Sequence, residues 1–294
     1  MKKILYVALL AMFLVGCDEG YNNNPSDENS NQSSSNDSEN DSENDSGDKP
    51  DDGPFTPAFS VSANQQVIFS PGNLQYHPKY NKWRFAENQT DYIGDANSNC
   101  SANYNGWLDL FGWSTSKTNF GVSTSTDYND YSGSFVDWGT NKIGNDAPNT
   151  WRTLTEDEWD YVVFNRPNAS SLKGVAQVNG VNGLILLPDN WTCPAGANFK
   201  SGFYSEYSVE AYAQYQTFTA EKWLKLESVG AVFLPAVGYR DGSYVNYVQE
   251  DGYYWSATED MSRIANYFDF YSDGANMNFH YRYLGYSVRL VKDL

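Results

Sequence analysis

The sequence is poor in the residues that most often carry chemistry or bind nucleic acid. Its 294 residues include 2 His, 3 Cys and 19 Lys and Arg against 37 Asp and Glu, which gives a net charge of −18. His77 and His280 each stand alone, and no Gly-x-Ser-x-Gly motif is present. We therefore expect no catalytic residue, no metal and no cofactor. The shortage of basic residues argues against nucleic acid, whose phosphates require a positive surface.

The first 17 residues have the features of a secretory signal. Lys2 and Lys3 precede an apolar stretch, Ile4–Val15, which is shorter than the roughly 20 residues that span a bilayer. The run that ends at Cys17, Leu-Val-Gly-Cys, resembles the lipobox of bacterial lipoproteins. This resemblance implies removal of residues 1–16, acylation of Cys17 and a membrane contact through the N-terminal lipid only. The alternative is an ordinary signal peptide with an incidental cysteine.

Residues 17–54 form an acidic segment rich in Asn, Ser, Asp and Glu. Residues 18–54 contain 12 acidic residues and a single lysine, Lys49, and no aliphatic residue. Such a segment cannot bury enough apolar surface to offset its ordering entropy, so we expect a disordered stalk. Asp18 and Glu19 resemble the acidic export signal of Bacteroidetes surface lipoproteins. We therefore expect an outer-membrane lipoprotein that faces outward, with the periplasmic face as the alternative.

Residues 55–294 have the length and composition of one large domain. They contain all 9 Trp of the chain, 21 of its 23 Tyr and 15 of its 16 Phe. Short apolar or alternating runs predict strands at 59–62, 66–69, 82–85, 183–188 and 229–235. The segment 94–149 is rich in Asn, Ser, Gly and aromatic residues, so we expect long loops held by aromatic side chains.

Two helices are predicted from their first turns. Thr155 and Glu158 have the spacing of a capping box, and Pro167 lies just beyond the expected end of that helix. The second helix is expected to start near Thr219 and to stop at Gly230. The three carboxylates at 156–158 are explained by the cap and the helix dipole rather than by an acid–base site.

Cys100 and Cys193 remain once Cys17 is assigned to the lipid. An even pair of cysteines in an exported protein usually forms a disulfide, which is the first expectation here. Two separate buried thiols are the second possibility. A metal pair is third, because neither cysteine lies in a Cys-x-x-Cys motif or beside a histidine.

Several segments of the domain resemble one family. Residues 151–161 resemble a segment of formylglycine-generating-enzyme-like domains, 252–258 resemble their Trp-containing core strand, and 286–291 resemble their closing strand, which would include Arg289. The segments 69–76, 83–86 and 186–191 add a resemblance to Bacteroidetes lipoproteins of the Fibrobacter succinogenes major paralogous domain type. The resemblance implies a C-type-lectin-like α+β fold with a small twisted antiparallel sheet, two helices and long irregular loops.

The resemblance does not fix the function. The family's copper-binding oxidases use a cysteine pair near the C-terminal end, and this chain has no cysteine after Cys193. We therefore expect a non-catalytic binding or adhesion module with a glycan, or next a surface protein, as its ligand. The alternatives are an enzyme with an unrecognised site and a structural component of a surface assembly. The candidate ligand-binding patch is Tyr239, Arg240, Tyr244, Tyr247, Tyr281, Arg282 and Tyr283.

Overall fold

The computed structural model describes residues 56–294. The signal at 1–16, the lipid-bearing Cys17 and the acidic stalk at 17–54 lie outside the described residues and stay predictions. Within 56–294, no helix is long and apolar enough to cross a membrane. The domain is of the mixed α+β class that the sequence predicts, with small, mostly antiparallel sheets and few helices.

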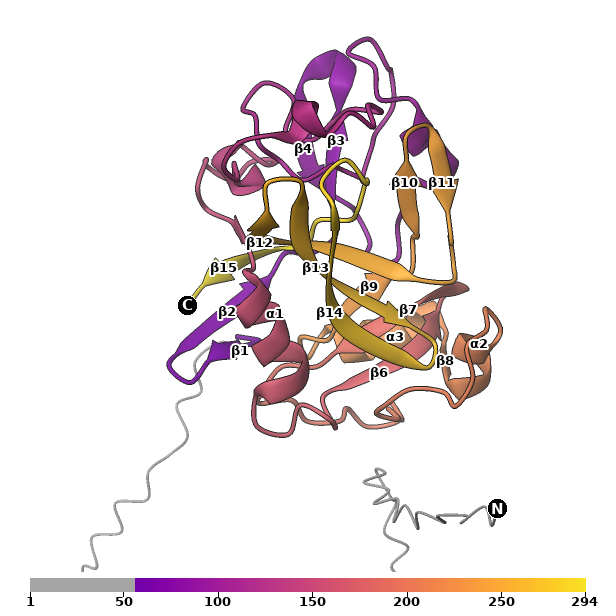
Figure 1. The fold of residues 1–294 in the computed structure, drawn as a ribbon. Coiled ribbons are helices and arrows are strands. Elements are labelled where there is room, and N and C mark those ends of the chain that lie inside the picture. Colours follow the sequence, from indigo (N-terminus) through magenta and orange to yellow (C-terminus); the bar gives the residue numbers. More distant parts are fainter. Residues whose placement is uncertain (1–55) are drawn as a thin grey trace, which may run out of the picture.

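One sheet joins the two ends of the described chain (Figure 1). Its antiparallel strands run in the order β1 (Phe59–Ser62), β2 (Gln65–Phe69), β15 (Leu290–Asp293) and β5 (Arg152–Thr153). In β1, Phe59 and Val61 are buried and alternate with half-buried serines, as expected for a strand with one face in the core. Val291 pairs with Phe69 on one side and Arg152 on the other.

A second sheet lies in the lower part of Figure 1 together with two of the helices, and it shares an apolar cluster with the first sheet. Its order is β8 (Thr217–Phe218), β6 (Lys173–Val178), β7 (Val181–Leu186) and β9 (Val232–Pro235). Strands β6 and β7 form a hairpin through Asn179 and Gly180, which both have positive φ, as a two-residue hairpin turn requires. The strands predicted at 183–188 and 229–235 are thereby confirmed, with shifted ends.

The third sheet is a meander at the centre of Figure 1, and two hairpins stand apart from it. The meander consists of β12 (Gly252–Met261), β13 (Ile264–Tyr271) and β14 (Gly274–Tyr281). The hairpins are β3 (Leu74–His77) with β4 (Lys82–Phe85), and β10 (Tyr239–Asp241) with β11 (Tyr244–Asn246). The meander supplies the Trp-containing strand that the sequence predicts.

Both predicted helix starts are confirmed. Helix α1 (Glu156–Asp160) continues as one π-helical turn, η5 (Tyr161–Asn165). At its start, Thr155 Oγ1 accepts from the Glu158 amide at 3.2 Å, and Glu158 Oε2 accepts from the Thr155 amide at 2.8 Å. Helix α3 (Ala220–Glu227) is capped by Thr219, and a short helix, α2 (Ala211–Tyr215), precedes it.

The segment 94–149 contains only short 3₁₀ turns and isolated bridges, as the sequence predicts. These turns are η2 (Gly94–Ser98), η3 (Tyr128–Tyr131) and η4 (Trp138–Thr140), and η1 (Pro78–Tyr80) is a fourth in the β3–β4 hairpin. Two fully buried tryptophans hold the segment. Trp113 Nε1 donates to the Ser256 carbonyl at 2.9 Å, and Trp138 Nε1 donates to the Phe120 carbonyl at 2.8 Å.

The closing strand starts later than predicted. Tyr286 and Ser287 form only isolated bridges, to Phe111 and Tyr254, and the regular strand begins at Leu290. Arg289 is buried, as its assignment to this part of the chain requires, and its Nη2 donates to Gln89 Oε1 at 2.5 Å. Complete burial lowers the pKa of Arg289 to about 10.

The expected disulfide is not formed. Cys100 Sγ donates to the Asn97 carbonyl at 3.3 Å, whereas Cys193 Sγ contacts the Ala197 carbonyl at 2.6 Å. Cys100 follows η2, which packs against β11, whereas Ala197 belongs to the apolar cluster of β6, β7 and α3. The two thiols therefore sit in different parts of the domain, each bonded within its own loop. Burial raises the pKa of the Cys100 thiol, and the positive charge of Arg240 opposes that rise.

Candidate functional site

The structure divides the predicted ligand-binding patch into two groups. Its tyrosines lie at least partly on the surface, with Tyr244 as much as 76% exposed, whereas Arg240 and Arg282 are 0% and 1% exposed. The two arginines therefore cannot contact a ligand at the surface, which corrects the expectation for both. We use the name tyrosine face for the remaining residues together with one that the sequence did not indicate, Tyr128: Tyr128, Tyr239, Tyr244, Tyr247, Tyr281 and Tyr283.

Arg240 is enclosed beneath the β10–β11 hairpin. Its Nη1 donates to the Gly242 carbonyl at 2.9 Å, within the same hairpin. Its backbone exchanges hydrogen bonds of 2.8 and 2.7 Å with Gly285, on which the side chain also packs. The guanidinium therefore stiffens the hairpin that carries Tyr239 and Tyr244.

Rings of the tyrosine face are stacked in two pairs. Tyr281 and Tyr283 lie with ring centroids 5.5 Å apart and planes at 13°, and Tyr128 packs on both at 5.0 and 5.5 Å. Tyr239 and Tyr247 lie 5.8 Å apart at 17°. Because tyrosine has few rotatable bonds and these rings hold one another, little conformational entropy remains to be lost when a ligand binds here.

A hollow of about 400 Å³ adjoins the tyrosine face. The tip of the β10–β11 hairpin forms one wall, and a loop rich in Ser and Thr forms the other. Its lining residues are Thr124, Thr126, Asp241, Gly242, Ser243 and Tyr244. Burial, and then the negative charge of Asp241, raise the pKa of Tyr283. Asp241 of the hollow therefore lies close enough to Tyr283 for its charge to act on that hydroxyl.

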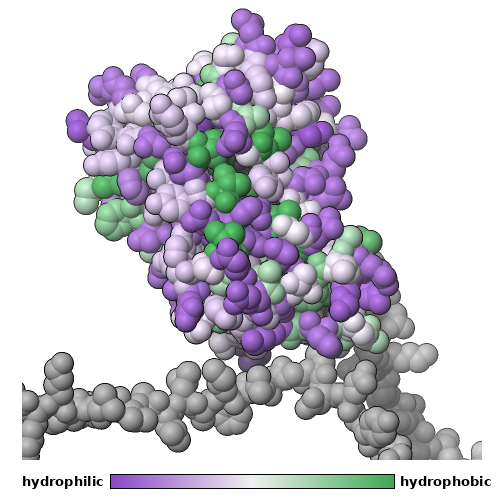
Figure 2. All heavy atoms as spheres, turned by 90° about the vertical axis from the view of Figure 1, so that its right-hand side faces the viewer, coloured by the Kyte–Doolittle hydropathy of each residue, from purple (hydrophilic) through white to green (hydrophobic). Residues whose placement is uncertain are grey.

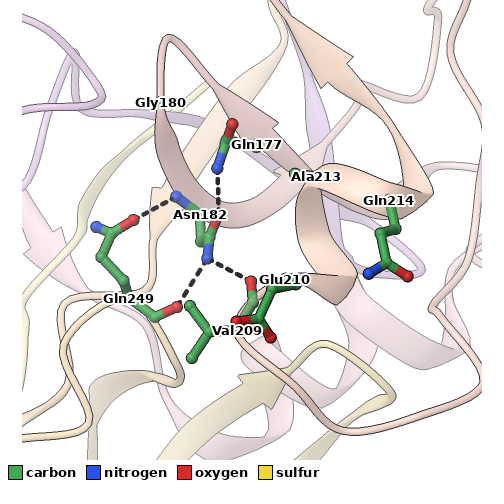
Figure 3. A pocket seen from close by; sticks show the side chains of 8 residues that line it. All are labelled: Gln177, Gly180, Asn182, Val209, Glu210, Ala213, Gln214 and Gln249. Atoms are coloured by element: carbon green, nitrogen blue, oxygen red, sulfur yellow. Dashed lines mark hydrogen bonds between the residues drawn. The ribbon is translucent and has the colours of Figure 1, made fainter.

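A second pocket, of about 540 Å³, lies between the β6–β7 hairpin and the start of α2 (Figure 3). We call it the amide pocket, because four carboxamide side chains line it. Its lining residues are Gln177, Gly180, Asn182, Val209, Glu210, Ala213, Gln214 and Gln249. Figure 2 shows the side of the molecule with α2 and the β10–β11 hairpin, where a narrow column of apolar side chains crosses a mainly hydrophilic surface.

Asn182 organises the amide pocket. Its Nδ2 donates to the Val209 and Gln249 carbonyls, both at 2.9 Å, and its Oδ1 accepts from Gln177 Nε2 at 3.1 Å. Its backbone amide donates to Gln249 Oε1 at 2.8 Å. Asn182 is 2% exposed, so these bonds fix the floor of the pocket from three segments. Sequence reasoning missed this residue, because its partners lie up to 67 positions away.

Two buried carboxylates are Asp269, which belongs to the meander, and Asp251, the residue just before it. Tyr253 donates to Asp251 Oδ2 at 2.9 Å, and Asn278 donates to Asp269 Oδ2 at 3.0 Å. Burial raises the pKa of Asp251, and raises that of Asp269 to about 6. Among residues 56–294, no group of three or more His, Cys, Asp or Glu side chains is arranged to hold a metal ion.

The seven predicted patch residues lie within one segment that a family model recognises. A domain of unknown function, DUF8237, matches residues 200–291. No curated protein and no solved structure matches the chain. The matched segment also includes five of the eight residues of the amide pocket, Val209, Glu210, Ala213, Gln214 and Gln249. The matched segment covers less than a third of the chain. The tyrosine face and the amide pocket each include residues outside it, such as Tyr128 and Asn182.

Proposed function

We propose that this protein is a lipid-anchored, non-catalytic binding module that takes a glycan on its tyrosine face. The observation that carries the proposal is the stacked pair Tyr281–Tyr283 together with the exposed Tyr244, which lines the neighbouring hollow. Aromatic rings pack on the apolar faces of sugar rings, while hydroxyl and carboxylate groups bond the sugar hydroxyls.

The chemistry of this surface favours a neutral glycan. Thr124, Thr126 and Ser243 provide hydroxyls around the hollow, and Asp241 provides an acceptor. An anionic glycan would meet the carboxylate of Asp241 and a chain whose net charge is −18. Like charges at close range disfavour binding, so a neutral chain of hexoses fits this surface better.

The proposed architecture is a C-type-lectin-like domain at the outer surface of the outer membrane. The antiparallel sheet that joins the two ends of the domain, the capped helix after it and the long loops at 94–149 support this class. The anchor rests on Cys17 and the preceding apolar run. Replacing Cys17 with Ala should abolish labelling by an alkyne fatty acid and release the protein from the membrane fraction, and retention of both would contradict the anchor.

Binding is tested with the purified full chain on an array of neutral and anionic glycans. We expect Tyr281→Ala and Tyr244→Ala to weaken binding of a neutral glycan about tenfold each, which corresponds to about 1.4 kcal/mol. The matched control is Tyr80→Ala, which removes an exposed tyrosine from the β3–β4 hairpin. Equal losses in all three variants, or no loss in the first two, would overturn the assigned face.

A further inference from the structure

The amide pocket has a fixed frame and unused bonding groups. The side chain of Asn182 is fully engaged in hydrogen bonds to the walls of the pocket, and the side-chain oxygen of Gln249 accepts from the backbone amide of Asn182. The amide nitrogen of Gln249 is buried and has no hydrogen-bond partner among the described residues. Gln249 also has a φ of +66°, a strained conformation for a residue with a side chain.

The opposite wall offers groups of its own. Gln214 Oε1 accepts from the Tyr204 hydroxyl at 2.9 Å, which leaves its amide nitrogen to donate elsewhere. In Figure 3 that nitrogen lies on the side of Glu210, and no dashed bond joins Gln214 to the other residues drawn. Gln177 donates its amide nitrogen to Asn182, so its oxygen remains an acceptor. The pocket therefore combines donors and acceptors.

The lining selects against charged anions and provides a small apolar contact. Glu210 is the only charged residue of the lining, so an anionic ligand finds no cation there. Val209, which is exposed, and Ala213 supply apolar surface. A ligand that suits these walls is neutral, carries both an N–H donor and a C=O acceptor, and has a methyl group beside them.

We propose that the amide pocket binds an acetamido sugar, at a site separate from the tyrosine face. The acetamido carbonyl accepts from Gln214 Nε2, its N–H donates to Gln177 Oε1 or Glu210, and its methyl group packs on Val209 and Ala213. The volume of about 540 Å³ lies in the range of small-molecule sites. The inference does not depend on the function proposed for the tyrosine face.

A peptide offers the same amide chemistry, but the sheet leaves it no place to add as a strand. Strands β6 and β7 are the inner strands of the order β8-β6-β7-β9. At the end next to the pocket, Gln177 and Val178 pair with β8, and the Asn182 carbonyl accepts from the Ala236 amide at 2.8 Å. An extended chain would therefore lack the backbone bonds that normally hold peptides on a sheet edge.

The test uses titration calorimetry of the purified full chain carrying Tyr281→Ala, which weakens the tyrosine face, with two matched disaccharides. N,N′-diacetylchitobiose carries acetamido groups, whereas cellobiose has hydroxyls in their place. We expect saturable binding of diacetylchitobiose at least tenfold tighter than that of cellobiose. Equal affinities, or no binding of diacetylchitobiose, would overturn the proposal. Equally tight binding of N-acetyl-alanine methylamide would also overturn it, in favour of a peptide ligand.

Variants locate the site. Gln214→Leu should weaken diacetylchitobiose binding at least tenfold. Because Gln214 is exposed and lies outside the Asn182 network, this variant should still fold. The matched control Gln65→Leu removes an exposed glutamine of β2 and should leave affinity unchanged. Tyr244→Ala, which alters the tyrosine face, tests whether the sugar binds there instead. If Tyr244→Ala abolished binding while Gln214→Leu did not, the acetamido sugar would belong to the tyrosine face and the amide-pocket assignment would be wrong.

Discussion

Arg282 lies over the indole ring of Trp113, with its guanidinium carbon 4.2 Å from the ring centroid. The same group donates to the carbonyls of Met261 at 2.7 Å and Gly133 at 3.0 Å, and pairs with Glu259 at 2.7 Å. A side chain between two surface tyrosines thus acts as an internal clamp. It ties the end of the meander to the loop region that precedes it in the chain.

We expect Arg282→Ala to lower the free energy of unfolding by about 3–5 kcal/mol. Removing a buried, hydrogen-bonded guanidinium leaves its carbonyl partners unpaired and Glu259 without a counter-charge. Denaturant unfolding of the full chain measures this change. The control is Arg263→Ala, an exposed arginine near Tyr128, for which we expect a change within about 0.5 kcal/mol. A stable Arg282→Ala protein would show that the clamp is dispensable.

The pH dependence of stability should contain a contribution from Asp269. Burial raises its folded-state pKa from 3.8 to about 6, so the folded protein holds this proton more tightly than the unfolded chain. The contribution of Asp269 to the free energy of unfolding is therefore largest below about pH 4 and is lost as the pH rises to about 6. The loss is on the order of 3 kcal/mol.

The variant Asp269→Asn cannot ionise and should decline less in stability between pH 4 and 6 than the wild type does. The quantity to compare is the difference between the two unfolding curves, since Asp189 and Asp293 have lowered pKa values and act in the opposite direction. Asp273→Asn, which alters an exposed carboxyl nearby, serves as the control. Parallel curves for wild type and Asp269→Asn would show that the aspartate ionises normally.

Cys100 and Cys193 should both titrate as thiols in denatured, unreduced protein. A Cys17→Ser chain avoids interference from the N-terminal cysteine. In the folded protein Cys100 should react slowly with a disulfide reagent, because burial raises its pKa and limits access. Reductant should leave the melting temperature unchanged. If the mass of the protein were lower by two hydrogens and no thiol reacted after unfolding, the two cysteines would form a disulfide and the prediction would be wrong.

Local sequence patterns predicted much of the fold correctly. They placed Arg282 of the candidate site on the surface, which was wrong. The cap at Thr155 was readable because its bonding groups lie three residues apart, and the helix start near Thr219 was readable from the local sequence. The sequence groups Arg282 with Tyr281 and Tyr283 in one surface patch, as expected for a charged residue, since charged residues usually face water. Here Trp113 and several distant carbonyls receive the arginine, so the tyrosines face outward.

The amide pocket was beyond such reasoning. Asn182 and Gln249 carry no signal individually, and their bond joins residues 67 positions apart. A lone asparagine in a strand ordinarily indicates exposure. Burial of Asn182 is tolerated because the backbone carbonyls of Gln249 and Val209 accept hydrogen bonds from its side chain.

The position of β15 between β2 and β5 has a consequence for biosynthesis. Val291 leaves the ribosome after nearly every other residue of the domain, yet it supplies the bonds that join Phe69 to Arg152. Until then the first strands have a missing neighbour and the apolar cluster around Trp159 lacks one wall. The domain therefore closes only after synthesis of its last strand, so the emerging chain stays open for almost the whole of its translation.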